Sequence, residues 1–172
     1  MQINAKLSKD KRIEIAAEEI FSKYGYEKAT LDQIISLADV GKGTVYKYFG
    51  NKEQLFYKLV SAKNEPFVEA LRVAVESESE LKDKLTAYFK VMVEFYQKNC
   101  ALWQIIYYEM LNDTHCTVVF DDEDNAQVIS RYSEDTVSDE VKERFLRYHN
   151  LLTSEFEILY KIVVDGMKEG TL

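Results

Sequence analysis

The segment from Thr30 to Lys52 constrains the fold of this chain more than any other stretch, because it holds two short helical patterns separated by a sharp break. Thr30 can cap the first helix, and Gln33 stands three residues later, which is the spacing of a capping box. The sequence Asp39-Val40-Gly41 then interrupts the helical pattern with residues that tolerate turn conformations. This pattern predicts a buried helix followed by a tight turn.

The second helix of the segment, about residues 42–49, has an apolar side and a polar, cationic side. Val45 and Phe49 are four residues apart, so they share one face and are expected to be buried. The rest of the helix carries groups that can donate hydrogen bonds to phosphate: Lys42, Thr44, Tyr46, Lys47 and Tyr48. Two helices, a sharp turn and a cationic face predict a helix-turn-helix.

Residues 30–56 resemble the DNA-binding region of the TetR family of bacterial transcriptional regulators. The matching words are Gly41-Lys42-Gly43-Thr44-Val45-Tyr46-Lys47-Tyr48-Phe49 and Asn51-Lys52-Glu53-Gln54-Leu55-Phe56, and residues 12–21 and 24–26 also fit. The resemblance covers about the first third of the chain. Two positions depart from the family pattern: Asp39 stands where the family usually has Gly, and Ile35 where it prefers Ala. We therefore expect the same turn, with slight strain at Asp39.

The resemblance implies contacts with DNA by eight residues. Lys42 and Thr44 are the candidates for base contacts, and Gly43 would allow close approach. Tyr46 would touch a base methyl group or a phosphate. Phosphate contacts are expected from the remaining four: Thr30, Lys47, Tyr48 and Lys52. The alternative interpretation is an exposed polar face with buried tyrosines and no role in DNA binding.

Charge is distributed unevenly along the 172 residues, whose net charge is −8. Residues 1–63 carry 11 Lys and Arg against 8 Asp and Glu, whereas residues 64–172 carry 11 against 22. A mildly basic head on an acidic body orients a protein on DNA. We expect residues 1–63 to form a three-helix DNA-binding domain and residues 64–172 a helical ligand-binding and dimerisation bundle. The predicted fold class is all-α, since no strand-like alternation of any length is present.

Apolar periodicity predicts five further helices: one over about residues 9–24, one that starts after the cap residue Asn51, and three over about residues 79–98, 101–111 and 138–168. Gly25, Asn99 and Gly170 are expected to end the first, third and fifth of them, and Ser138 to cap the fifth.

In two regions the sequence does not decide the local structure. At Pro66, either one long helix kinks, or a new helix starts with Asn64 as its cap. Residues 114–135 are expected to form a loop, with a short helix over about residues 125–132.

Aromatic residues are dense after Pro66, and the resemblance implies a ligand pocket in this part of the chain. The candidate lining residues are Phe89, Tyr96, Trp103, Tyr107, Tyr148 and Phe156, with Glu94 or Glu109 to hold a cationic ligand. Residue by residue, ordinary core packing is the favoured alternative.

Other sites are not supported by the sequence. The acidic run 121–124 lacks the Gly and the terminal Glu of an EF-hand loop, and His115-Cys116 has no further ligands at suitable spacing. No catalytic arrangement is evident, so we expect no enzyme activity, no metal and no cofactor. The two cysteines form no CxxC motif, and neither a signal peptide nor a membrane-spanning run is recognisable, which indicates a cytoplasmic protein.

The sequence therefore predicts a TetR-like regulator, namely a repressor that a small-molecule effector releases from a double-stranded DNA operator. It would act as a homodimer, with two recognition helices about one turn of DNA apart and no membrane partner. The main alternative is a helical protein-interaction module of the same fold without operator binding. Family members usually continue with two pairing helices after the position of Leu172, so we expect a shortened protein or an incomplete C-terminus.

Overall fold

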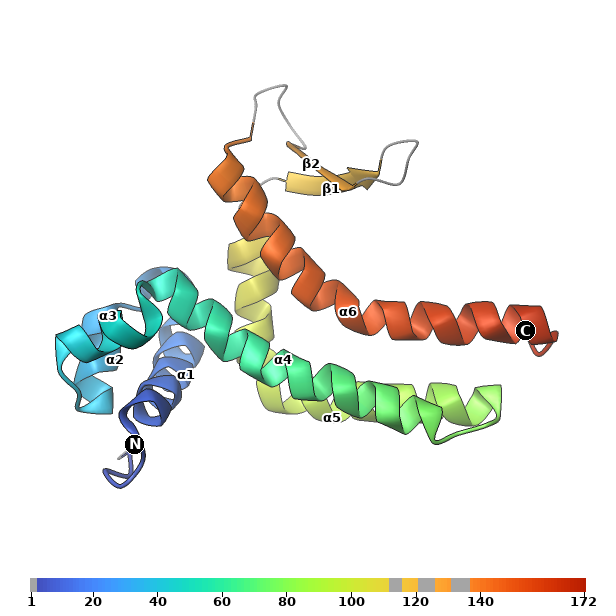
Figure 1. Cartoon of the computed structure of the whole chain (residues 1–172), viewed down its shortest axis with the longest axis horizontal. Helices are drawn as coiled ribbons and strands as arrows, with labels where there is room; N and C mark the ends of the chain where they lie inside the picture. Colours follow the sequence, from blue (N-terminus) through green and yellow to red (C-terminus); the bar gives the residue numbers. More distant parts are fainter. Residues whose placement is uncertain (1–2, 112–115, 121–125, 131–136) are drawn as a thin grey trace. The chain divides into compact units, whose positions relative to one another are not determined.

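The computed structural model describes residues 3–111, 116–120, 126–130 and 137–172. The chain folds into two compact units, Met1–Lys63 and Asn64–Leu172. Within the described residues, six α-helices, one π-helical turn and one two-stranded sheet make up the secondary structure (Figure 1). The predicted helical fold class is confirmed, and the small sheet is the exception to it.

The first unit contains α1 (Lys9–Lys28), α2 (Leu31–Ala38), α3 (Lys42–Phe49) and the beginning of α4 (Lys52–Glu76). Gly25 interrupts α1 with φ 75° and ψ 174°, so the regular part of the helix stops there, as predicted. An L-residue with a side chain would be strained at this positive φ.

Aromatic and aliphatic side chains from all four helices form the core of the first unit. Phe21 of α1 and Phe56 of α4 meet edge to face, with ring centroids 4.9 Å apart. Tyr24, by contrast, is 39% exposed, although its place on the apolar stripe of α1 favours burial. The other buried core residues include Ile13, Ala16, Ala17, Ile20, Ile34, Ala38, Val45, Phe49, Leu55, Leu59 and Val60. This core fixes the two short helices α2 and α3 on α1 and α4.

Helix α4 runs through Pro66 as one helix, so of the two alternatives at Pro66 the new start at Asn64 is wrong. Proline cannot donate to the carbonyl oxygen four residues earlier, which belongs to Ala62. Ala62 and Pro66 are both exposed, so water can replace the lost hydrogen bond. Asn64 is buried and donates from Nδ2 to the carbonyl oxygen of Leu151 at 3.1 Å, which is a packing role and not a cap.

Helix α5 (Leu81–Ile105) continues past Asn99, where a helix end was predicted. The Asn99 side chain donates to the carbonyl oxygen of Phe95 at 2.9 Å, so its polar group is satisfied inside the helix. A π-helical turn, η1 (Ile106–Leu111), follows directly. The separate helix predicted over residues 101–111 is therefore the end of α5 together with η1.

Strands β1 (Cys116–Phe120) and β2 (Ala126–Ser130) form an antiparallel hairpin, and Val118 pairs with Val128. The predicted loop and short helix are therefore wrong for residues 116–120 and 126–130, which form strands. β-Branched residues favour extended backbone, and hydrogen bonding between the two segments stabilises both of them as strands. Cys116 and Val128 pack against Phe145 of α6. The predicted acidic run 121–124 and His115 lie outside the described residues.

Helix α6 (Asp139–Glu169) has the ends that were predicted for it. The Ser138 hydroxyl accepts a hydrogen bond from the Val141 amide, and Gly170 ends the helix in the left-handed conformation with φ 70°. The α6 residue Ile162 joins a core cluster with α4 and α5, whose other buried members are Phe67, Leu71, Val75 and Tyr88. None of the helices in the described ranges is both long and apolar enough to cross a bilayer.

Candidate nucleic-acid interface and ligand-binding region

The capping box at Thr30 is present and fixes the start of α2. Thr30 Oγ1 accepts from the Gln33 amide at 3.2 Å, and Gln33 Oε1 accepts from the Thr30 amide at 2.8 Å. The amides of the first helical turn that remain outside this box carry the positive end of the helix dipole. A helix terminus of this kind can bind a phosphate group.

Arg12 of α1, which the sequence did not single out, holds the turn between α2 and α3. Asp39 adopts the left-handed conformation at φ 50° and ψ 55°, as expected for its place in the turn. Arg12 of α1 donates from Nη2 to both the carbonyl oxygen and the carboxylate of Asp39, the latter at 3.0 Å. Because the guanidinium binds the backbone and the side chain together, it stabilises the conformation that an Asp adopts at some cost.

Helix α3 buries Val45 and Phe49, as predicted, and leaves its other residues at the surface. Tyr46 and Tyr48 are about half exposed, Lys47 is exposed and Thr44 is half-buried. The tyrosines are therefore not core residues, in contrast to the alternative interpretation. At Gly43 an added Cβ would meet no heavy atom within 4 Å, so the backbone there is open to a partner.

The three predicted DNA-contacting lysines lie in different environments. Lys42 Nζ is 3.2 Å from Asp32 Oδ1 of α2, and this hydrogen bond raises the pKa of the Lys42 ammonium. Lys47 has no hydrogen-bonding or ionic partner among the described residues. Lys52 is turned inward and donates to the carbonyl oxygens of Tyr26 and Ala29, at 2.9 and 3.2 Å.

The Lys52 ammonium is therefore occupied by backbone carbonyl groups, whereas the Lys47 side chain is exposed. The Lys52 ammonium also lies 4.3 Å from the centroid of the Tyr26 ring, a cation–π distance. Lys58, not singled out from the sequence, occupies the end of α3, where it donates to the Tyr48 carbonyl oxygen at 2.8 Å. A cation at a helix C-terminus complements the helix dipole. No local spacing indicates this contact, because the two residues lie ten apart across a turn.

The residues predicted to line a ligand pocket differ in burial. Trp103 and Tyr148 are buried, and Tyr96 is half-buried with its ring centroid 6.4 Å from that of Trp103. The other four lie at the surface: Phe89, Glu94, Tyr107 and Phe156. The side chain of Glu109 lies outside the described part of the chain. Ligand contact by these residues stays a prediction.

A buried carboxyl group in the second unit was missed by the sequence reasoning. Glu155 of α6 has no exposed surface, and its Oε1 accepts a hydrogen bond from the Tyr96 hydroxyl at 2.8 Å. Burial raises the pKa of the Glu155 carboxyl group. The spacing of Tyr148, Glu155 and Ile162, seven residues apart on the apolar stripe of α6, is the signal that could have identified it.

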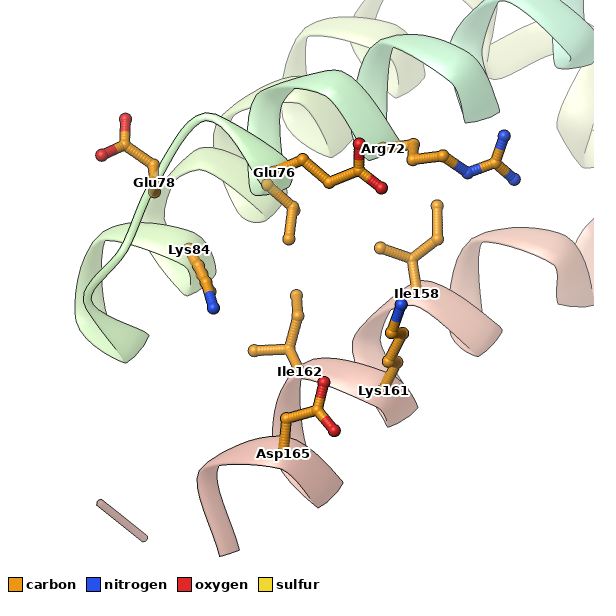
Figure 2. Close-up of a pocket in the computed structure, with 9 residues that line it drawn as sticks. Arg72, Glu76, Glu78, Lys84, Ile158, Lys161, Ile162 and Asp165 are labelled. Carbon is orange, nitrogen blue, oxygen red and sulfur yellow. The ribbon is translucent and has the colours of Figure 1, made fainter. Parts of the chain in front are cut away.

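A pocket of about 300 Å³ lies between the end of α4, the beginning of α5 and the second half of α6 (Figure 2). Its lining consists of Arg72, Val75, Glu76, Glu78, Lys84, Ile158, Lys161, Ile162 and Asp165. None of the residues predicted from aromatic density is among them. Across the described ranges, no group of three or more His, Cys, Asp and Glu side chains is suited to hold a metal ion.

Comparison with known proteins identifies the first unit. Residues 15–59 match the family model described as bacterial regulatory proteins, tetR family. The uncharacterized HTH-type transcriptional regulator YhgD of Bacillus subtilis is 46% identical over 50 residues, which cover 29% of this chain and 26% of that protein. The fatty acid metabolism regulator protein of the same organism is 33% identical over 70 residues, covering 41% and 36%.

Solved structures resemble a larger part of the chain. A tetR-family regulatory protein from Rhodococcus RHA1 superimposes with a TM-score of 0.69 at 21% identity, over 96% of this chain and 73% of that one. At this identity the likeness shows the fold alone. The second unit is therefore related to known structures by its architecture, and the sequence matches concern mainly the first unit.

A capped α2, a left-handed turn and an α3 with an exposed cationic face define a helix-turn-helix protein. Together with the matches, this identifies the first unit as a helix-turn-helix of the kind found in transcriptional regulators. Residues 15–59 therefore carry the TetR-family DNA-binding motif, and the chain as a whole resembles TetR-family structures in fold. The two curated relatives are matched over about a quarter and about a third of their own lengths.

Proposed function

We propose that this protein is a DNA-binding repressor that a small molecule, bound in the second unit, releases from its operator. The observation that carries the proposal is the exposed side of α3. Buried Val45 and Phe49 anchor the helix, while Gly43, Tyr46 and Lys47 remain accessible on it. A short helix presented in this way fits the major groove of double-stranded DNA.

Base contacts in this proposal come from the first turn of α3. Gly43 leaves room for the DNA to approach the backbone, and Thr44 beside it offers a hydroxyl and a methyl group. A threonine can donate to a base or contact the methyl group of thymine. Lys42 reaches the groove only if its ammonium leaves Asp32, 3.2 Å away. Base contact by Thr44 thus needs less rearrangement than base contact by Lys42.

Phosphate contacts in this proposal come from Thr30, Lys47 and Tyr48. Thr30 stands at the start of α2, where backbone donors are oriented outward. Lys47 is exposed and has no partner among the described residues, so phosphate binding disrupts no internal contact. Lys52 would have to give up two carbonyl contacts, so its share in DNA binding is proposed to be indirect.

Operator binding further requires two linked heads, and we propose a homodimer. One head recognises one half-site, and a second linked head adds effective concentration that raises the total affinity. An effector releases the operator only if it binds more tightly to the arrangement that does not fit DNA. The resemblance of the chain in fold to a regulator whose structure was solved in complex with stearoyl-CoA supports a ligand-binding role for the second unit.

The test is DNA binding by the purified protein at two salt concentrations, on duplexes selected from a random library. Lys47→Ala should weaken binding on every duplex and reduce the slope of log affinity against log salt by about one. Thr44→Ala should instead change which duplexes are preferred. Lys90→Ala, an exposed lysine on α5 in the second unit, serves as the matched control and should change neither quantity.

The outcomes separate this proposal from a protein-interaction module of the same fold. Selection of no preferred duplex, with binding that does not depend on salt, would favour the interaction module. If Lys47→Ala and Lys90→Ala change DNA affinity equally, α3 does not contact the DNA.

A further inference from the structure

The pocket in the second unit combines an apolar floor with a charged rim (Figure 2). Val75 of α4 and Ile162 of α6 belong to the buried core of this unit, and half-buried Ile158 packs against the same core. The three side chains present adjacent aliphatic surface. The volume of about 300 Å³ lies at the lower end of the range for small-molecule sites, about 300–1,000 Å³.

The rim of the pocket holds charges of both signs that are not paired with each other. Arg72 is engaged outside the pocket, where its Nη1 lies 2.9 Å from Glu69 Oε2. Lys84 of α5 and Asp165 of α6 are half-buried, and within the described ranges neither has an ion-pair partner within 4.0 Å. A half-buried charge without a partner loses part of its hydration and gains nothing in return.

The view in Figure 2 places these two groups on different helices around the same space. The Lys84 amine points from α5 toward the gap between the helices, and the Asp165 carboxylate lies beside Ile162 on α6. A bound molecule can therefore reach a cation and an anion at once while covering the aliphatic floor. The remaining charged residues of the rim, Glu76, Glu78 and Lys161, are exposed and hydrated.

We propose that this pocket binds a small zwitterion with an aliphatic body, of the size and chemistry of a branched-chain amino acid. Its carboxylate pairs with Lys84, its ammonium pairs with Asp165, and its side chain covers Val75, Ile158 and Ile162. Each charged pair is a charge-assisted hydrogen bond, which is stronger than a neutral one. The inference rests on the proposed function, because it names the class of effector that the second unit takes.

Calorimetric titration of the intact protein with four probes tests the chemistry. L-leucine should bind saturably. N-acetyl-L-leucine lacks the ammonium and L-leucinamide lacks the carboxylate, so each should bind at least about tenfold more weakly, a difference of about 1.4 kcal/mol. Glycine keeps both charges but has no aliphatic body, and it should also bind more weakly. Equal affinity for leucine and N-acetyl-leucine, or no saturable binding of leucine, would overturn the proposal.

Two variants assign the charges to their residues. Lys84→Gln should lower leucine affinity about tenfold and abolish the preference for leucine over leucinamide. Asp165→Asn should lower it similarly and abolish the preference for leucine over N-acetyl-leucine. Lys82→Gln and Asp83→Asn, exposed neighbours on α5 that do not line this pocket, are the matched controls. A reciprocal change in selectivity cannot arise from loss of folding, and its absence in both variants would refute the assignment.

DNA binding measured with and without leucine distinguishes this inference from the proposed function. Release of DNA by leucine in the parent protein, but not in Asp165→Asn, supports both. Leucine binding by a protein that binds no DNA would support the pocket and overturn the regulator. DNA binding by a protein that shows no leucine affinity would overturn the pocket alone.

Discussion

Replacing Glu155 with glutamine should stabilise the protein at neutral and alkaline pH and have little effect in acid. In the folded state the carboxyl group is fully buried, and Oε1 accepts from the Tyr96 hydroxyl at 2.8 Å. Oε2 is also buried and has no hydrogen-bond partner among the described residues. Glutamine retains the acceptor for Tyr96 and removes the negative charge.

The sign of the pH dependence follows from the direction of the pKa shift. Burial raises the pKa of Glu155 in the folded state, so the folded protein binds this proton more tightly than the unfolded chain does. The free energy of unfolding contributed by the group is therefore largest below the unfolded pKa, near 4.3. It decreases as the pH rises toward the folded pKa, and above that value it is constant.

The size of the effect is set by two opposing terms. Burying an isolated carboxylate costs several kcal/mol, and each unit of pKa shift corresponds to about 1.4 kcal/mol. The glutamine amide would bury two N–H donors in the position of Oε2, and an unsatisfied donor costs about 1–3 kcal/mol. We therefore expect Glu155→Gln to gain about 1–2 kcal/mol at pH 8. At pH 4 the change should be about zero, because the protonated carboxyl group also buries an O–H donor there.

Urea unfolding between pH 4 and 8 measures this difference. Glu157→Gln, on the exposed side of α6, is the control and should change the free energy of unfolding by less than about 0.5 kcal/mol at every pH. A Glu155→Gln effect that is the same at pH 4 and pH 8 would refute the idea that a buried charge is responsible. A loss of stability at pH 8 would mean that burying the amide donors costs more than burying the carboxylate.

Three further substitutions test other parts of the structure. Trp103→Ala should lower the free energy of unfolding by about 3–5 kcal/mol, because the indole is 1% exposed, and a loss below about 1 kcal/mol in urea unfolding would contradict its core position. Asp32→Asn should release Lys42 and raise affinity for non-specific duplex DNA several-fold at low salt; unchanged affinity would show that this ion pair does not restrain Lys42. Lys52→Ala should destabilise the fold by about 1–2 kcal/mol by thermal or urea unfolding, because two carbonyl oxygens lose their donor, and full stability would argue against the inward position.

Features that depend on a few neighbouring residues were predictable from the sequence. The capping box of Thr30 and Gln33, the break at Gly25 and the ends of α6 at Ser138 and Gly170 all appear in the structure. Each depends on backbone conformation or on a hydrogen bond that spans three or four residues. The burial of the apolar faces of α1 to α3 follows from helical periodicity in the same way.

The hairpin shows where local patterns stop being sufficient. Thr117, Val118 and Val119 favour extended backbone, yet a strand forms only because Val118 pairs with Val128 and Thr117 with Ile129, 10 and 12 residues away in the chain. Asn99 shows the same limit for a helix, since a residue that often ends helices is tolerated where the helix continues to buried Leu102 and Trp103. In both cases packing overrides residue preference.

The sequence by itself determined the helix-turn-helix, because its caps, turn and apolar spacing are all short-range. Only the tertiary structure decided which polar groups face inward. Lys52 reaches the Tyr26 carbonyl oxygen 26 residues away, Tyr96 reaches Glu155 across 59 residues, and Asn64 reaches Leu151 across 87. A polar side chain can be hydrated at the surface or satisfied inside by a group far along the chain, and that choice depends on packing between helices, which no local pattern encodes.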